Sequence, residues 1–279
     1  MLLSRTYRPS ADLAPYIRRF YVLEAPLPDG AVIEDFLLSE TAFVRCLIRG
    51  DWAAETSPGQ WNTAGNIVFF GANSRPLRVR VRGSFAVTGF AVRLSGWHAL
   101  FAAPHNMLAD KMLPLQQLWG DLAEAMFHGV SQAGDDDGQL AVMENALRQQ
   151  LAVLNAPSAD DRMARFEVIA RTDSTMRVED VGTHIGLSVR QLERRCLATF
   201  GLTPKAILRR SRFLDTATAL RGFSSPSDGE LDALRYFDQS HMNREFRNYT
   251  GMTPRTFANA TTPLQTAGLK LREESRFED

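Results

Sequence analysis

The chain contains little cysteine and no long hydrophobic stretch. Its 279 residues include two cysteines, Cys46 and Cys196, and no Cys-x-x-Cys pair. This scarcity argues against a disulfide framework or a thiolate zinc site and fits a reducing compartment. No apolar run approaches the roughly 20 residues of a membrane-spanning helix, and the N-terminus has no signal-peptide pattern. We therefore expect a cytoplasmic protein without a membrane partner.

Residue patterns of common enzymes are missing as well. The five histidines are scattered, and no His-x-His or Glu-x-x-His pair lies on a predicted strand, which argues against a metal-dependent oxygenase. The chain has no Gly-x-Ser-x-Gly nucleophile, phosphate loop or dinucleotide fingerprint. We predict no catalytic residue, no metal and no cofactor, and therefore no enzyme.

The chain also lacks an excess of charge of either sign. Lysine and arginine number 32, as do aspartate and glutamate. Residues 176–258 carry 13 basic against 9 acidic residues, a net charge of +4. A strongly basic domain is the usual mark of nucleic-acid binding, so any such binding is expected to involve few phosphate contacts and to be sensitive to salt.

Short strands are predicted in the first third of the chain. Residues 32–94 contain several apolar runs separated by glycine and proline, which is typical of a small β-barrel or sandwich. Residues 77–82 alternate strictly, and Gly83-Ser84 is predicted to turn them into a hairpin with residues 85–94. Arginines share one face of this strand, and that face either is solvated or binds an anionic effector: Arg78, Arg80 and Arg82.

An amphipathic helix and a linker follow the strands. Apolar residues recur every three or four positions between Leu140 and Leu154, and their stripe either packs on the barrel or forms a homodimer interface. The segment 156–161 is the best linker, with Ser158 or Asp160 as the cap of the next helix.

The most informative feature is a pattern that occurs twice in the last third of the chain. The first copy is Ser188-Val-Arg-Gln-Leu-Glu-Arg-Arg-Cys-Leu-Ala-Thr-Phe-Gly-Leu-Thr-Pro204. The second is Ser240-His-Met-Asn-Arg-Glu-Phe-Arg-Asn-Tyr-Thr-Gly-Met-Thr-Pro254. Each predicts a short helix with one apolar side and one polar side, ending at Gly-x-Thr-Pro. Such a helix, entered through a tight turn, is the recognition element of a helix-turn-helix.

These residues resemble the AraC/XylS family of bacterial transcription regulators. The similarity covers roughly residues 160–258 and is most specific at Asp238-Gln-Ser-His241 followed by Thr250-Gly-Met-Thr-Pro254. The resemblance implies an α+β protein with two domains. Residues 1–155 would form a cupin-like barrel or sandwich with flanking helices that senses an effector and dimerises. Residues 160–258 would form an all-α tandem helix-turn-helix domain, and residues 259–279 are expected to be a disordered tail.

In the first unit, residues 178–185 are the predicted scaffold helix, Gly186 the turn and Ser188 the cap of the recognition helix. The helical period buries Leu192, Cys196 and Phe200. Arginine pairs with guanine and glutamine with adenine in the major groove, whereas Arg194 could equally bind phosphate. The candidate DNA-binding residues are Ser188, Val189, Arg190, Gln191, Arg194 and Arg195.

In the second unit, Leu231, Leu234 and Phe237 are assigned to the scaffold helix and turn, and Met242, Phe246 and Tyr249 to the buried stripe of the recognition helix. Candidate DNA-binding residues are Gln239, Ser240, His241, Asn243 and Arg244. For His241 we favour a phosphate or backbone contact over zinc binding, because no second ligand lies at the required spacing. The family usually has glycine where Arg235 stands, so this unit is expected to be less sequence-specific.

A helix from Pro204 to about Leu220 is predicted between the units. At 1.5 Å per residue it spans about 25 Å, which suits two successive major grooves about 34 Å apart. The sequence therefore predicts a regulator that binds double-stranded DNA, with a small-molecule effector and RNA polymerase as further partners and activation as the commoner outcome in the family. The alternative is a degenerate member that acts by protein contact and does not recognise specific DNA.

Overall fold

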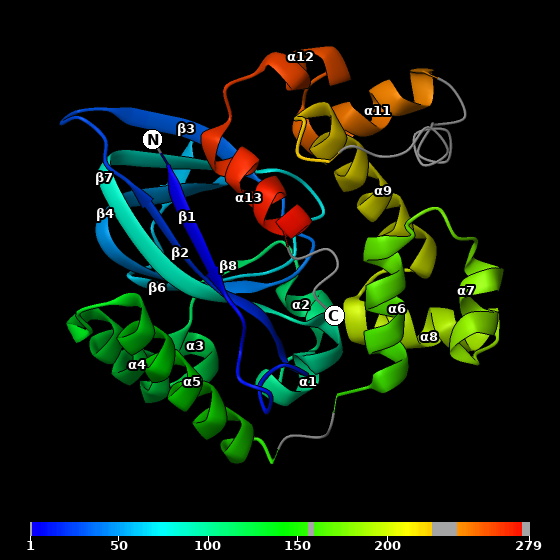
Figure 1. The fold of residues 1–279 in the computed structure, drawn as a ribbon, viewed down its shortest axis with the longest axis horizontal. Coiled ribbons are helices and arrows are strands. Elements are labelled where there is room, and N and C mark those ends of the chain that lie inside the picture. The colour runs from blue at the N-terminus through cyan, green and yellow to red at the C-terminus, as the bar shows by residue number, and fades with distance from the viewer. Residues whose placement is uncertain (1, 156–158, 225–238, 275–279) are drawn as a thin grey trace.

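The computed structural model describes residues 2–155, 159–224 and 239–274, which form a sheet domain and a helical region beside it (Figure 1). The strands are β1 Leu3–Tyr7, β2 Ile17–Ala25, β3 Val32–Leu37, β4 Phe43–Ser57, β5 Gln60–Asn62, β6 Ile67–Phe70, β7 Leu77–Val92 and β8 Met112–Pro114. They form one antiparallel sheet in the order β1-β2-β7-β4-β6-β8, with β3 added to β7 and β5 to β4. The expected β-rich N-terminal domain is confirmed.

The predicted hairpin at Gly83-Ser84 is wrong, because β7 runs on through this dipeptide. Residues 85–92 of β7 pair with β2, and residues 77–82 pair with β3. Along its other edge, β7 pairs with β4 both before and after Gly83, and the register of this pairing shifts between Arg49 and Asp51 of β4. Gly83 has φ +63°, so it supplies the bend of a bulge. The bend curls the sheet where a hairpin would have reversed the chain.

The arginine ladder of β7 lies on a solvated face. Arg78 pairs with Glu55 at 2.7 Å, and Arg80 pairs with Glu34 at 2.6 Å. The guanidinium of Arg80 also lies 3.9 Å from the ring centre of Trp61. These partners account for the ladder without an effector.

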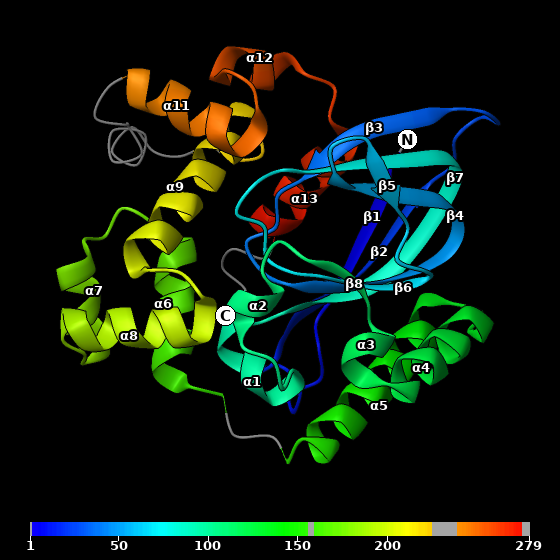
Figure 2. The same cartoon turned by 180° about the vertical axis from the view of Figure 1, so that it is seen from behind.

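Helices cover another part of the sheet's convex face (Figures 1 and 2). They are the 3-10 helix Leu94–Gly96, α1 Trp97–Leu100, α2 His105–Leu108, α3 Gln116–Trp119, α4 Asp121–Gln132 and α5 Asp136–Val153. Met143 and Leu147 of α5 are fully buried in one core with Phe69 and Phe90 of the sheet. The apolar stripe of α5 therefore packs on the sheet of its own domain, which was one of the two expected roles for this stripe.

The helical region follows the predicted pattern closely. It contains α6 Asp161–Thr172, α7 Val178–Ile185, α8 Val189–Phe200, α9 Pro204–Leu220, α11 Gln239–Thr250, α12 Pro254–Asn259 and α13 Pro263–Glu274. Asp160 caps α6, and its carboxylate accepts hydrogen bonds from the amides of Arg162 and Met163. The scaffold helix α7 and the connecting helix α9 have the predicted bounds.

The expectation of a disordered tail at residues 259–279 is wrong for residues 263–274. These residues form α13, which returns to the sheet domain and lies against β3 and α9 (Figure 1). Leu264 and Ala267 join the core on the concave face of the sheet, whereas Leu269 joins a cluster with Phe213 of α9. The helix forms because both of its apolar sides are buried between the two parts of the protein.

Candidate nucleic-acid interface

The start of α8 has the geometry of a helix-turn-helix. Gly186 adopts the left-handed conformation with φ +71°, which residues with a side chain rarely adopt. Ser188 then caps α8, since its hydroxyl accepts a hydrogen bond from the Gln191 amide at 3.3 Å. The Gln191 side-chain oxygen accepts one from the Ser188 amide at 2.9 Å. This reciprocal capping box fixes where the recognition helix begins.

The predicted inner side of α8 is confirmed. Leu192 and Cys196 are fully buried, and Phe200 stacks on Phe166 of α6 with ring centres 5.6 Å apart. Burial raises the pKa of the Cys196 thiol, so this thiol packs as a small apolar group. The opposite side of α8 is consequently fixed toward solvent.

Three candidate side chains are exposed on that side: Arg190, Gln191 and Arg194. Val189 is half-buried. Arg195 lies on the flank, where its guanidinium pairs with Asp160 at 2.5 Å. Because Asp160 also caps α6, this pair joins two helices of the first unit. The structure therefore gives Arg195 a bracing contact and leaves the other two arginines accessible.

The second recognition helix, α11, packs through aromatic rings. Phe246 lies edge-on to Phe213 of α9 at 4.9 Å and to Phe257 of α12 at 5.5 Å. Tyr249 contacts the same Phe213 ring at 4.6 Å. Phe246 and Tyr249 are buried as predicted, and Met242 packs partly against this cluster. The rings fix which side of α11 faces outward.

The candidates on α11 differ in accessibility. Ser240 and Arg244 are exposed, and His241 and Asn243 are half-buried. The Gln239 side chain lies outside the described residues. So do Arg235 and the residues assigned to the second scaffold helix and turn, which are Leu231, Leu234 and Phe237.

Sequence reasoning missed two residues of α11. Arg247 is exposed three positions after Arg244, and this i, i+3 spacing could have identified it as part of the same face. Glu245 is 6% exposed, and it pairs with Arg209 of α9 at 3.2 Å. No sequence signal pointed to Glu245, because an acidic residue on a recognition helix looks like part of its solvated face.

The Gly-x-Thr-Pro motif has the same structure in both units. Gly201 and Gly251 end their helices with φ +65° and +72°. Thr203 and Thr253 then cap the next helices, accepting hydrogen bonds from the amides of Ala206 at 3.3 Å and Thr256 at 3.2 Å. The proline occupies the first turn, where a missing amide proton costs nothing. The repeated motif is thus a repeated helix-to-helix corner.

The two recognition helices lie at the two ends of α9. In both views, the amino-terminal ends of α8 and α11 point away from the sheet domain, to the same side of the molecule (Figures 1 and 2). Exposed arginines lie in the first turn of α8 (Arg190) and in the second turn of α11 (Arg244), near the amino-terminal ends that enter a major groove. Their separation is set by the 17 residues of α9.

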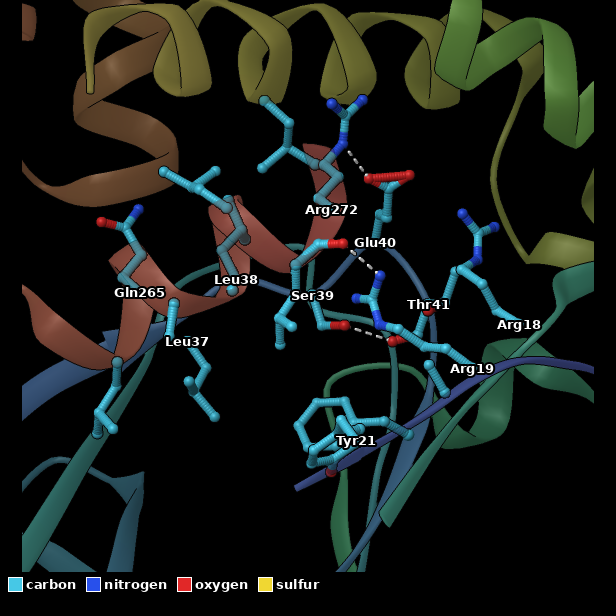
Figure 3. Close-up of a pocket in the computed structure, with 18 of the residues that line it drawn as sticks. Arg18, Arg19, Tyr21, Leu37, Leu38, Ser39, Glu40, Thr41, Gln265 and Arg272 are labelled. Atoms are coloured by element: carbon cyan, nitrogen blue, oxygen red, sulfur yellow. Dashed lines mark hydrogen bonds and ion pairs between the residues drawn. The ribbon is translucent and has the colours of Figure 1, made fainter. Parts of the chain in front are cut away.

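Buried ion pairs hold this helical region against the sheet domain. Arg272 of α13 pairs with Glu40, between β3 and β4, at 2.6 Å (Figure 3). It also pairs with Asp215 of α9 at 2.7 Å. Arg18 of β2 pairs with Glu167 of α6. The arginine charges hold the pKa of Glu40 below its usual range despite burial, so this carboxylate is ionised at neutral pH.

Further contacts fix both ends of α13. The Asp35 carboxylate on β3 accepts hydrogen bonds from the amides of Leu264 at 2.7 Å and Gln265 at 3.2 Å. At the other end, Arg19 of β2 donates to the Leu271 carbonyl at 2.6 Å. A carboxylate at the start and a cation at the end match the helix dipole. The sheet domain therefore binds α13 at both termini.

Within residues 2–155, 159–224 and 239–274, no group of three or more His, Cys, Asp or Glu is arranged to hold a metal ion. The helices of the same residues include none long and apolar enough to cross a membrane.

A complete turn-and-recognition helix in the first unit, a second exposed recognition helix and a rigid helix between them define a DNA-binding helix-turn-helix module. A family model described as "Helix-turn-helix domain" matches residues 181–260. Residues 181–260 are therefore a helix-turn-helix domain of the AraC type, which supports a DNA-binding role in transcription regulation. No curated protein matches the chain.

Solved structures with a similar arrangement include ToxT from Vibrio cholerae. One ToxT structure is 10% identical, with 92% of this chain and 97% of that chain covered and a TM-score of 0.47. ToxT bound to an unsaturated fatty acid is 12% identical, with 86% and 94% covered and a TM-score of 0.45. The AraC-like transcriptional activator CuxR is 13% identical, with 76% and 86% covered and a TM-score of 0.28. This degree of similarity carries over neither ligand nor target.

Proposed function

We propose that this regulator is an effector-responsive activator that recognises two successive major-groove segments of one DNA duplex. The observation that carries the proposal is the common orientation of α8 and α11 at the two ends of α9, with Arg190 exposed in the first turn of α8 and Arg244 in the second turn of α11. A spacer of about 25 Å suits grooves about one turn apart, with some bending of the DNA.

Arg190 is proposed as the main base contact of the first unit. A guanidinium can bind guanine through two hydrogen bonds, and Arg190 forms no ion pair with another described residue that would compete with DNA. Gln191 is less available, because its oxygen accepts the Ser188 amide proton in the capping box. Only its amide nitrogen can contact a base while that box is closed. Ser188, Val189, Arg194 and Arg195 are proposed to position the helix through phosphates or packing.

In the second unit, Arg244 is proposed as the base or phosphate contact, with Arg247 beside it on the same face. Ser240, at the start of α11, can donate its hydroxyl proton to a phosphate. His241 and Asn243, both half-buried, can donate a ring and an amide N–H respectively. Gln239 completes the proposed set from its place at the first residue of α11.

The effector is proposed to act through the contact between the sheet domain and α13. Because α13 follows the second unit directly, a ligand that changes how α13 is seated changes where α11 can lie. RNA polymerase and a second copy of the chain are proposed as protein partners on the resemblance alone.

The alternative function is regulation by protein contact without specific DNA recognition. The modest charge of the region and the closed capping box at Gln191 favour it. The exposed arginines on both recognition helices oppose it.

Recovery of genomic DNA fragments by the purified full chain, followed by sequencing, tests the proposal. At about physiological salt we expect an enriched motif with two half-elements about 10 bp apart. The same selection with Arg190→Ala should lose one half-element and keep the other. Retention that is uniform across sequence and disappears with modest salt would support the protein-contact alternative.

A further inference from the structure

A cavity of about 130 Å³ lies under α13, at the concave face of the sheet. The sheet contributes Tyr21, Phe43 and Ala91 to its wall, and α13 contributes Leu264 and Leu271. Figure 3 shows the polar rim, where Glu40 meets Arg272 and where Ser39 and Thr41 lie beside Arg19. The cavity therefore has an apolar body and a charged rim.

Arg45 is a cation buried in the wall of this cavity. It is 8% exposed and lies on β4 two residues after Phe43, so both side chains face the same side of the sheet. Its guanidinium lies 4.4 Å from the ring centre of Trp52, 5.2 Å from that of Phe70 and 5.3 Å from that of Phe43. Aromatic rings thus surround a charge that would ordinarily be found in water.

The described residues offer Arg45 no carboxylate. None of their ion pairs includes Arg45, and its Nε has no hydrogen-bond partner among them. The single acidic residue of the described cavity wall is Glu40, which pairs with Arg272. Contact with aromatic rings offsets only part of the desolvation cost of a buried guanidinium. An anion bound in the cavity would offset the rest of this cost, so the surroundings of Arg45 favour anion binding.

The volume limits what such an anion can carry. A cavity of roughly 150 Å³ in a protein core accommodates one benzene molecule. The 130 Å³ here, with walls of Tyr21, Leu23, Phe43 and Ala91, therefore suits an apolar group of about six carbons.

We propose that the cavity binds a small monocarboxylate with an apolar body of about six carbons, and that Arg45 pairs with its carboxylate. The site lies between the sheet and α13, so the bound molecule contacts both.

The position of α13 gives this site a regulatory consequence, which rests on the proposed function. Leu264, Ala267 and Leu271 of α13 line the cavity, while Arg272 of the same helix pairs with Asp215 of α9. A molecule that fills the cavity therefore changes the packing of the helix that joins the second unit to the sheet domain. DNA affinity should respond to the ligand through α11.

Isothermal titration calorimetry on the full chain without DNA tests the site. The probes are butanoate, hexanoate and benzoate, each compared with its neutral amide. We expect hexanoate or benzoate to bind best and each bound carboxylate to bind about tenfold or more tightly than its amide, because a charge-assisted bond to a buried guanidinium is lost in the amide. The variant R45M should remove this preference, whereas R49M, at an exposed position of the same strand, should keep it.

A second variant tests the place of binding without touching a charge. Gly268 of α13 lines the cavity and is exposed, and a Cβ there meets no atom within 4 Å. G268L should narrow the opening and weaken carboxylate binding, whereas K270L, on an exposed position of the same helix, should not. Equal binding of acids and amides, or binding unchanged in both R45M and G268L, would overturn the site. If a carboxylate binds and leaves DNA affinity unchanged, the site stands and its role as an effector site fails.

Discussion

The two helix-turn-helix units share a motif but are stabilised differently. The first unit packs Leu192, Cys196 and Phe200 into a core that also includes Leu94 of the sheet domain. The second unit packs through a ring cluster on α9 and reaches the sheet domain through Phe36 and α13. The first unit is thus seated directly on the sheet domain, whereas the position of the second depends largely on the helix that follows it.

This difference indicates which unit is easier to regulate. Near the first unit, a Cβ added to Gly201 would lie 3.0 Å from the Cβ of Asn106 on α2, so the two parts touch with little room between them. Near the second unit, the contact includes α13 and the cavity beneath it. A ligand can displace packing at a cavity far more easily than at a filled contact, so we expect regulation to act on the second unit.

Removal of a core ring from each unit should give the largest effects. F246A removes contacts with the rings of Phe213 and Phe257, whereas F200A removes one stacked ring, that of Phe166. We expect F246A to lower the free energy of unfolding by about 4–5 kcal/mol and F200A by about 3 kcal/mol. Chemical denaturation measures both, and L197A, at a half-exposed position of α8, serves as the control. A larger loss of unfolding free energy in F200A than in F246A would mean that the core around α11 is less tightly packed than the core around α8.

The second largest effect should come from acid, which should lower the stability of the contact between α2 and the first unit. Burial, together with the charge of Arg210, lowers the pKa of His105 to about 4, below the roughly 6.5 of an unfolded histidine. The unfolded chain then binds more protons than the folded chain between these pH values. The stability that neutral His105 provides is complete above about pH 6.5 and is lost as the pH falls toward 4, by roughly 3 kcal/mol in total.

The variant H105F isolates this effect, because phenylalanine keeps an aromatic contact with Trp97 and cannot titrate. The free energy of unfolding should fall more between pH 7 and pH 4.5 in the parent chain than in H105F. Equal falls in the two proteins would show that other groups carry the acid sensitivity.

Loss of an exposed arginine from each recognition helix should have smaller and unequal effects on DNA binding. We expect R190A to lower affinity for the selected site by about 1–3 kcal/mol and to relax its sequence preference. R244A should weaken binding more uniformly across sequences, since the second unit is predicted to be less specific. Fluorescence anisotropy with matched and scrambled duplexes measures both, with R82A in the sheet domain as the charge control. Equal loss of discrimination in R190A and R244A would contradict the predicted difference.

The repeated caps should give the smallest effects. Thr203 and Thr253 make the same hydrogen bond at the start of α9 and α12. Alanine at either position should cost about 1 kcal/mol of stability. T203A should also lower DNA affinity more than T253A, because α9 sets the separation of the recognition helices and α12 does not. Thermal unfolding and the same anisotropy assay test the pair.

The local structure of the first unit was predictable because its signals are local. Gly186, Ser188 and the apolar residues of α8 are close in sequence and fix a turn, a cap and a buried side by backbone sterics and helical period. The partner of Arg195 was not predictable, because Asp160 lies 35 residues away. The capping contact of Gln191 could have been predicted from its spacing to Ser188 and was missed because the residue was considered only as a base contact.

The β7 error has a similar origin. Gly83-Ser84 is a turn signal in isolation, and what keeps the strand extended is its pairing with β4 along both halves. A dipeptide carries no information about a partner strand that lies thirty residues earlier in the chain.

The sequence by itself determined the two recognition helices, the cap of α8 and the length of the helix between them, since each depends on residues within a few positions of one another. It also contained a signal for α13, namely a third Thr-Pro pair at Thr262-Pro263 followed by Leu264, Ala267 and Leu271 at helical spacing. Only the tertiary structure decided that this segment folds and where it lies. Its amides bind Asp35 and its arginine pairs with Glu40 and Asp215, and these are partners that a twelve-residue helix cannot supply for itself.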